Sequence, residues 1–92
     1  MSDPGPLVWI GSLGPEGGAE RVIAAFDLLC TFDDPLAELV IAGPARDAAH
    51  LAALRRYRDE LKLFRLRFHV DPSPAERASL RRLGPAWPEP EA

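Results

Sequence analysis

The sequence predicts a small α/β domain with a three-stranded parallel sheet and the element order β-α-β-α-β-α. Short apolar runs lie at residues 7–10 and 39–42, a more polar one lies at 66–70, and all three are too short for a helix. The stretches between and after these runs show the apolar spacing of amphipathic helices. They are also long enough to return the chain in the same direction, as parallel strands require.

The first strand, 7–10, is a continuous apolar run bounded by Pro6 and Gly11, which is typical of a buried parallel strand. A glycine-rich turn over 11–18 leads into a first helix. The Asp33-Asp34-Pro35 sequence ends this helix, because the residue before a proline avoids the α conformation. We expect its buried face to hold Ala19, Val22, Ala25, Phe26, Leu29 and Cys30. Cys30 is thus interpreted as a core residue and not as a nucleophile.

The second strand, 39–42, is ended by Gly43 and Pro44. A second helix is predicted from Asp47, a suitable N-cap residue, to about Lys62. Its apolar periodicity predicts a buried face made of Leu51, Leu54, Tyr57, Leu61 and Phe64.

The third strand, 66–70, is more polar, which suits the edge of a sheet. The sequence Ser73-Pro74-Ala75-Glu76 then predicts a helix start, with Ser73 as N-cap, Pro74 at the first position and Glu76 completing a capping box. Gly84 and Pro85 end this helix near residue 83. We therefore expect a flexible N-terminus over 1–6, a folded half-domain over 7–83 and a flexible, proline- and acid-rich tail over 84–92.

Composition is that of one ordinary globular domain, with 92 residues, 47% hydrophobic and 27% charged. The sequence contains no signal-peptide pattern and no run of about 20 apolar residues that could span a bilayer. One cysteine excludes an intrachain disulfide. These observations favour a cytoplasmic protein without a membrane span.

The net charge of −3 is unevenly distributed. Residues 1–45 hold one arginine and seven acidic residues, residues 46–82 hold ten basic and five acidic residues, and the tail adds two acids. A basic segment can attract phosphate or nucleic acid. These bases, however, are spread around helices without interleaved aromatic residues, so we expect a solvated surface and no nucleic-acid partner.

The glycine-rich turn is the first candidate site. Gly11, Gly14, Gly17 and Gly18 follow a strand and precede a helix, where backbone N–H groups and the helix dipole can bind phosphate. Their spacing matches neither the dinucleotide-binding pattern nor a Walker loop. A tight strand-to-helix turn is the alternative interpretation.

Other chemistry is sparse. His69 ends the third strand, where a ligand could reach it, whereas His50 is interpreted as a surface histidine. No group of residues has metal-ligand spacing, and neither Ser12 nor Ser73 has the sequence context of a nucleophile. We expect no catalytic residue, no metal and no cofactor.

Residues 10–18, with the following Val22-Ile23-Ala24-Ala25-Phe26, resemble the start of the C-terminal, nucleotide-sugar-binding domain of GT-B glycosyltransferases of the family-four (group one) class. That family reads roughly V-G-R-L-x-P-E-K-G, followed by an I-x-A-F helix. The resemblance extends over about 7–83 and includes Gly43 and the Ser-Pro-Ala-Glu turn. Gly17-Gly18-Ala19-Glu20-Arg21-Val22 also resembles a G-G-A-E-R-V sequence in the N-terminal domain of the same enzymes, although the later spacings fit the C-terminal domain better.

The resemblance implies a three-layer or open-faced, Rossmann-like half-domain with a degenerate nucleotide-sugar site. By this alignment the site comprises Gly11, Ser12, Gly14, Gly17, Gly18, Gly43 and His69. Ser12 stands where the family has a diphosphate-binding arginine, and Gly17 stands where it has a lysine. The family's acidic motif and acceptor domain have no counterpart in this sequence. Binding of a nucleoside-diphosphate sugar should therefore be weak.

Three hypotheses follow. The chain is a fragment or degenerate homologue of a glycosyltransferase, inactive by itself; or it is a non-catalytic interaction module; or, least favoured, it binds nucleic acid or phosphate through its basic segment. Whether it is an enzyme stays open at this point. We also expect a homo-oligomer, because the first strand would form an open edge of the sheet, with Leu7 and Trp9 at the interface.

Overall fold

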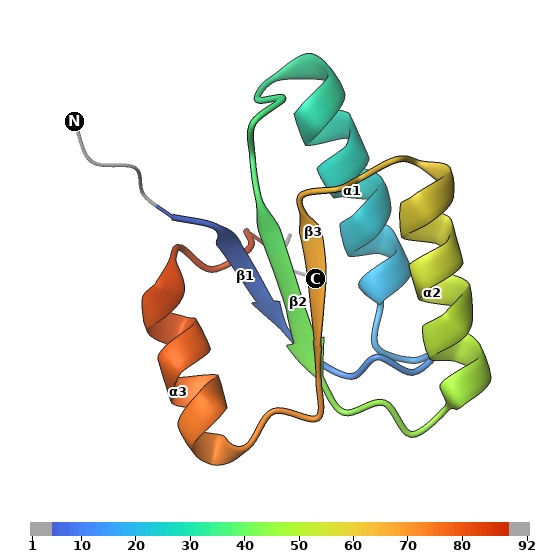
Figure 1. The fold of residues 1–92 in the computed structure, drawn as a ribbon, viewed down its shortest axis with the longest axis vertical. Helices are drawn as coiled ribbons and strands as arrows, with labels where there is room; N and C mark the ends of the chain where they lie inside the picture. The colour runs from blue at the N-terminus through green and yellow to red at the C-terminus, as the bar shows by residue number, and fades with distance from the viewer. Residues whose placement is uncertain (1–4, 89–92) are drawn as a thin grey trace.

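The computed structural model describes residues 5–88 and confirms the predicted fold class (Figure 1). The chain forms a three-stranded parallel sheet whose strands alternate with three helices. The elements are β1 (Leu7–Ile10), α1 (Ala19–Phe32), β2 (Leu39–Gly43), α2 (Ala48–Glu60), β3 (Leu66–Val70) and α3 (Pro74–Leu83).

The strands lie in the order β1-β2-β3. Leu39 at the start of β2 is the partner of Leu7 in β1 and of Leu66 in β3, so the three strands begin at one level. Their carboxyl ends consequently share one edge of the sheet, which is the edge where ligands bind in folds of this kind.

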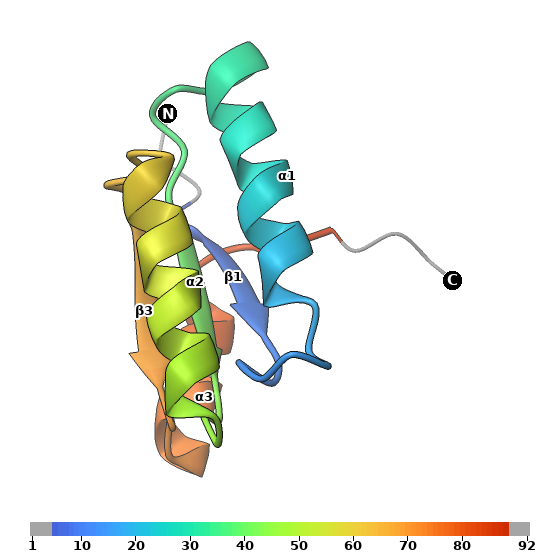
Figure 2. The same ribbon diagram turned by 90° about the vertical axis from the view of Figure 1, so that its right-hand side faces the viewer.

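Helices cover both faces of the sheet, α1 and α2 on one and α3 on the other (Figures 1 and 2). Alternate strand residues supply two cores, as the pleat requires. Trp9 and Ile41 belong to the larger core, on the side of α1 and α2. Val8 and Val40 pack with Leu80 of α3 in the smaller one. The sheet is thus buried on both faces, in agreement with its continuous apolar strands.

Two helix starts follow the local sequence closely. The Asp47 side chain accepts a hydrogen bond from His50 N, which caps α2. At α3, Ser73 Oγ accepts from Glu76 N at 3.1 Å and Glu76 Oε1 accepts from Ser73 N at 3.0 Å, so the predicted capping box is confirmed.

The predicted buried faces of α1 and α2 need two corrections. In α1, Ala25 is exposed although it was expected on the buried face, and Ile23, which was not expected there, is fully buried. After α2, Leu63 is buried and Phe64 is 85% exposed. The helix has already ended at Glu60, and Lys62 adopts a left-handed conformation with φ of 57°, so the helical periodicity does not continue to residue 64.

The outer edge of β1 is paired, whereas the sequence led us to expect an open edge of the sheet there. Leu7 N donates to Glu38 O on the β2 side, whereas Val8 N donates to Pro85 O at 2.9 Å on the opposite side. Trp87 N in turn donates to Val8 O at 2.8 Å. Residues 85–87 therefore run parallel to β1 and occupy the position of a fourth strand. Part of the segment expected to be a flexible tail is thus paired with the sheet, while 1–4 and 89–92 lie outside the described residues.

Candidate functional site

The glycine-rich loop between β1 and α1 lies at the carboxyl edge of the sheet, as expected from the sequence. Its one charged side chain, Glu16, accepts a hydrogen bond of 2.6 Å from Ser12 Oγ. Ser12 Oγ also accepts from Gly14 N at 3.1 Å. The Ser12 hydroxyl and a further bond from its own backbone N–H hold the pKa of the Glu16 carboxyl below its ordinary value. The loop therefore presents an anion at the amino end of α1.

Gly17 is required by the closed shape of this loop. A Cβ atom added at Gly17 would lie 1.9 Å from the carbonyl oxygen of Ser12, so no side chain fits without movement of the backbone. Gly18 has a φ of 81°, a left-handed conformation that favours glycine, and precedes α1 as its N-cap. The loop is a tight strand-to-helix turn, and a lysine at position 17 is incompatible with it.

Gly43, the last residue of β2, packs against the first residue of this loop. A Cβ atom at Gly43 would lie 1.6 Å from Gly11 O, and Gly11 N donates to Ala42 O at 2.9 Å. The structure thus brings together the glycines that the sequence singles out, from the ends of β1 and β2. Gly17 and Gly43 allow close backbone packing at the carboxyl edge, whereas a Cβ atom at Gly11 or Gly14 would meet the side chain of Trp9 or Glu16.

His69, the remaining residue of the predicted site, is engaged with α3. Its Nε2 lies 2.7 Å from Glu76 Oε2, and Glu76 is also the acceptor of the capping box. The pKa of Glu76 is lowered, first by the Ser73 backbone N–H and then by the hydrogen bond with His69. His69 therefore links the end of β3 to the start of the next helix.

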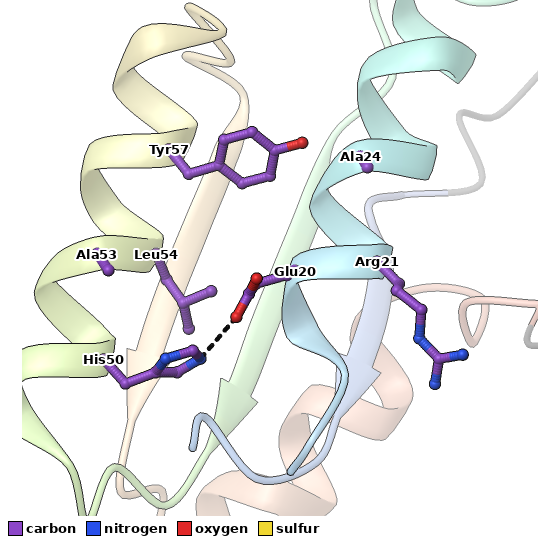
Figure 3. Close-up of a pocket in the computed structure, with 7 residues that line it drawn as sticks. All are labelled: Glu20, Arg21, Ala24, His50, Ala53, Leu54 and Tyr57. Atoms are coloured by element: carbon purple, nitrogen blue, oxygen red, sulfur yellow. Dashed lines mark ion pairs between the residues drawn. The ribbon is translucent and has the colours of Figure 1, made fainter. Parts of the chain in front are cut away.

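A groove of about 360 Å³ lies between α1 and α2 (Figure 3). His50 Nε2 lies 3.1 Å from Glu20 Oε1, and the His50 side chain is only 15% exposed. Tyr57 extends from α2 toward α1, whereas Arg21 points away from the pair. The sequence alone indicates that His50 is a surface histidine and does not predict this pairing. The pairing depends on how two helices pack, which no local sequence pattern indicates.

Among the described residues, the groove around the His50–Glu20 pair offers no serine or threonine hydroxyl and no thiol on which the pair could act. A carboxylate can orient an imidazole for general-base catalysis, but a nucleophile or a substrate position must lie within reach. The other residues that line the groove are Arg21, Ala24, Ala53, Leu54 and Tyr57, with no serine, threonine or cysteine among them. We interpret the pair as a polar contact that fixes the spacing of two helices.

A second groove, of about 480 Å³, lies beside β1 where residues 85–87 pair with it. Arg81 of α3 is its one charged lining residue, and Val8 and Ile10 of β1 contribute apolar surface. From β1 the chain adds β2 and then β3 on one side of β1. After α3 it returns and pairs with the other side of β1 through Ala86, so the direction in which the sheet grows reverses at β1. Such a switch point is where ligands enter α/β folds.

The two residues expected at an interface, Leu7 and Trp9, are not on an exposed edge. Trp9 is 6% exposed and belongs to the larger core, and Leu7 is half-buried against that core. Trp9→Glu would therefore place a charge in the core and unfold the protein, so it is unsuitable as a test of association.

Within residues 5–88, no group of three His, Cys, Asp or Glu side chains is arranged to hold a metal ion. No helix in the same part of the chain is long and apolar enough to cross a membrane. Comparison of the sequence with known protein families and with curated proteins, and of the structure with solved structures, finds no match.

Proposed function

We propose that this chain is a degenerate half-domain of the glycosyltransferase type that transfers no sugar and works as a non-catalytic protein-interaction module. The fold supports the first part of the proposal. A three-stranded parallel sheet whose strands alternate with helices is consistent with the Rossmann-like half-domain that the resemblance implies. The geometry of the loop after β1 supports the loss of sugar transfer.

The observation that carries the proposal is the contact of Gly17 with Ser12. The position that holds a diphosphate-binding lysine in the family is closed by the Ser12 carbonyl, 1.9 Å from where a Cβ would lie. The serine itself replaces the family's arginine. Each charge-assisted hydrogen bond contributes roughly 1.5–3 kcal/mol, so the loss of two weakens diphosphate binding by about 3–6 kcal/mol.

The remaining charge of the loop acts in the same direction. The family pattern also has a glutamate at the position of Glu16, but there two cations accompany it. Here the carboxylate is held in its ionised form by Ser12, at the place that a diphosphate would approach. Two like unit charges 4 Å apart repel by about 1 kcal/mol in water and by more near a protein surface.

A second candidate is a working half-site for a nucleoside-diphosphate sugar. The groove at the switch point favours it, because Arg81 offers a cation beside the apolar surface of β1. Arg81, however, lies on the face of the sheet covered by α3 and not in the loop after β1. It therefore replaces neither of the two cations that this loop lacks. We therefore place this candidate second.

Calorimetric titration of the full chain with UDP- and GDP-linked sugars tests the proposal. We expect a dissociation constant in the millimolar range or weaker, and no hydrolysis of the donor. The control variants are Glu16→Gln, which removes the anion, and Arg81→Ala, which removes the cation of the groove. Micromolar binding by the wild-type chain that Arg81→Ala abolishes would overturn the proposal in favour of the second candidate.

A further inference from the structure

Four large apolar side chains, besides Leu83 at the end of α3, are exposed near the amino end of the sheet. They are Leu28 (58%), Phe32 (81%), Leu36 (69%) and Phe64 (85%), and together we name them the amino-end patch. Phe32 ends α1, Leu28 precedes it by one helical turn, and the other two lie in the loops that lead into β2 and β3. In Figure 1, where the strand arrows point down, α1 and α2 both end at the top.

The two loops of the patch are in contact. Arg65 Nη1 lies 3.2 Å from Glu38 Oε1, and Leu39 N donates to Arg65 O at 3.0 Å. Leu36 and Phe64 each lie within two residues of this connection. The loops that carry Leu36 and Phe64 are thus neighbours at the edge of the sheet opposite the glycine-rich loop.

Charges of opposite sign flank the patch. On the α1 side, Asp33, Asp34 and Glu38 line a groove of about 480 Å³ that also includes Leu36, and no lysine or arginine lines it. On the other side, the exposed Lys62 and Arg65 stand immediately before and after the Leu63-Phe64 pair. Because Glu38 and Arg65 pair with each other within the chain, the charges that remain for a partner are the acidic Asp33 and Asp34 on one side and the basic Lys62 on the other.

We propose that a second copy of this chain covers the amino-end patch in a two-fold symmetric dimer. A two-fold axis through the patch brings Phe32, Leu36 and Phe64 of both copies together and places the acidic flank of each copy against the basic flank of the other. A self-complementary charge pattern of this kind fits a second copy better than a partner of uniform charge. The inference rests on the proposed function as an interaction module and gives that function a surface and a partner.

The sheet edges are less suitable for pairing copies. Residues 85–87 already occupy the Val8 backbone on the outer edge of β1. The opposite edge strand, β3, carries Arg67 and His69 within it and follows Arg65 directly. Charged side chains on an edge strand oppose pairing with another sheet.

Light scattering of the full chain at micromolar concentrations tests the dimer. We expect the wild type at twice the chain mass of 10.1 kDa and both Phe64→Glu and Phe32→Glu at the mass of the monomer. The matched control is Ala52→Glu, which adds the same charge at an exposed position of α2 outside the patch and should remain dimeric. Far-ultraviolet circular dichroism confirms that each variant is folded, since both phenylalanines are exposed.

A charge exchange tests the orientation of the two copies. Asp33→Lys should weaken self-association because basic groups then face each other, and Lys62→Glu should weaken it because acidic groups do. An equimolar mixture of these two variants should recover dimers, because both junctions of the mixed dimer join opposite charges.

A monomeric wild type overturns the inference, and so does a dimer that the patch substitutions leave intact. Neither result depends on the titration with nucleotide sugars. Micromolar sugar binding, conversely, would remove the proposed function without deciding whether the patch joins two copies.

Discussion

The ring of Trp87 meets the ring of Phe26 edge-on, with their centroids 6.3 Å apart and their planes at 65°. This contact joins residues 85–87, which pair with β1, to helix α1. Trp87→Ala should destabilise the protein by about 0.5–3 kcal/mol, since edge-to-face pairs and half-buried aromatic area are lost together. Thermal unfolding measures the change. Trp87→Phe keeps a ring against Phe26 and should lose less; equal melting temperatures for wild type and Trp87→Ala would show that the segment contributes nothing.

Ser73→Ala should destabilise the protein by about 0.5–2 kcal/mol through loss of the N-cap of α3. The removed hydroxyl accepts the Glu76 backbone N–H, which is left to water in the variant. Denaturant titration followed by circular dichroism provides the free energy of unfolding. Ser79→Ala, at an exposed position inside the same helix, is the control and should have little effect. An equal loss in both variants would contradict a specific capping role.

Glu76 should make stability depend on pH in the acid range. Its pKa in the folded protein is lowered from 4.5, so the ionised group stabilises the fold above that value, and the stabilisation is lost as the pH falls below 4.5 toward the lowered pKa. Glu76→Gln keeps an oxygen that can accept the Ser73 N–H but does not titrate. The variant should therefore show a smaller fall in melting temperature below pH 4.5 than the wild type, with a residual fall from Glu16, whose pKa is also lowered. Parallel melting curves for the two proteins would exclude this role of Glu76.

Gly43→Ala should be strongly unfavourable, because the new methyl group meets the Gly11 carbonyl oxygen and the two backbones must separate. Overpacking of this kind costs about 1–3 kcal/mol or more. Gly14→Ala is the matched control, since its methyl group would meet only the end of the Glu16 side chain, which can rotate away. Urea denaturation of both variants makes the comparison. A milder effect at position 43 than at position 14 would mean that the contact between the ends of β1 and β2 relaxes easily.

The sequence was sufficient to predict the features that depend only on residues close together in the chain. The capping box at Ser73 and the N-cap at Asp47 depend on residues three positions apart, and the structure has both. The outward position of Phe64 was not predicted. It results from the left-handed conformation of Lys62, and no proline or glycine near Lys62 indicates a turn there. Of the candidate site, the grouping of Gly11, Gly17 and Gly43 could be predicted from the topology of parallel strands.

What the sequence could not supply are contacts between distant segments. The pairing of His50 with Glu20 requires knowing which turns of α1 and α2 face each other. The closure of the loop at Gly17 depends on the path of Ser12 and not on glycine spacing. Both are consequences of packing, which residue patterns constrain only in part.

The pairing of Val8 with Ala86 joins two residues that are separated by nearly the whole chain. During synthesis, β1 leaves the ribosome long before its partner on the outer edge, which follows α3 in the sequence. β2 and β3 can assemble beside β1 in the meantime, whereas its outer backbone groups wait for residues 85–87. Contacts of such sequence separation form slowly, and an unpaired strand edge is a site of mispairing between chains. Nascent chains of this protein are therefore expected to be most prone to aggregation until residues 85–87 have been synthesised and paired with β1.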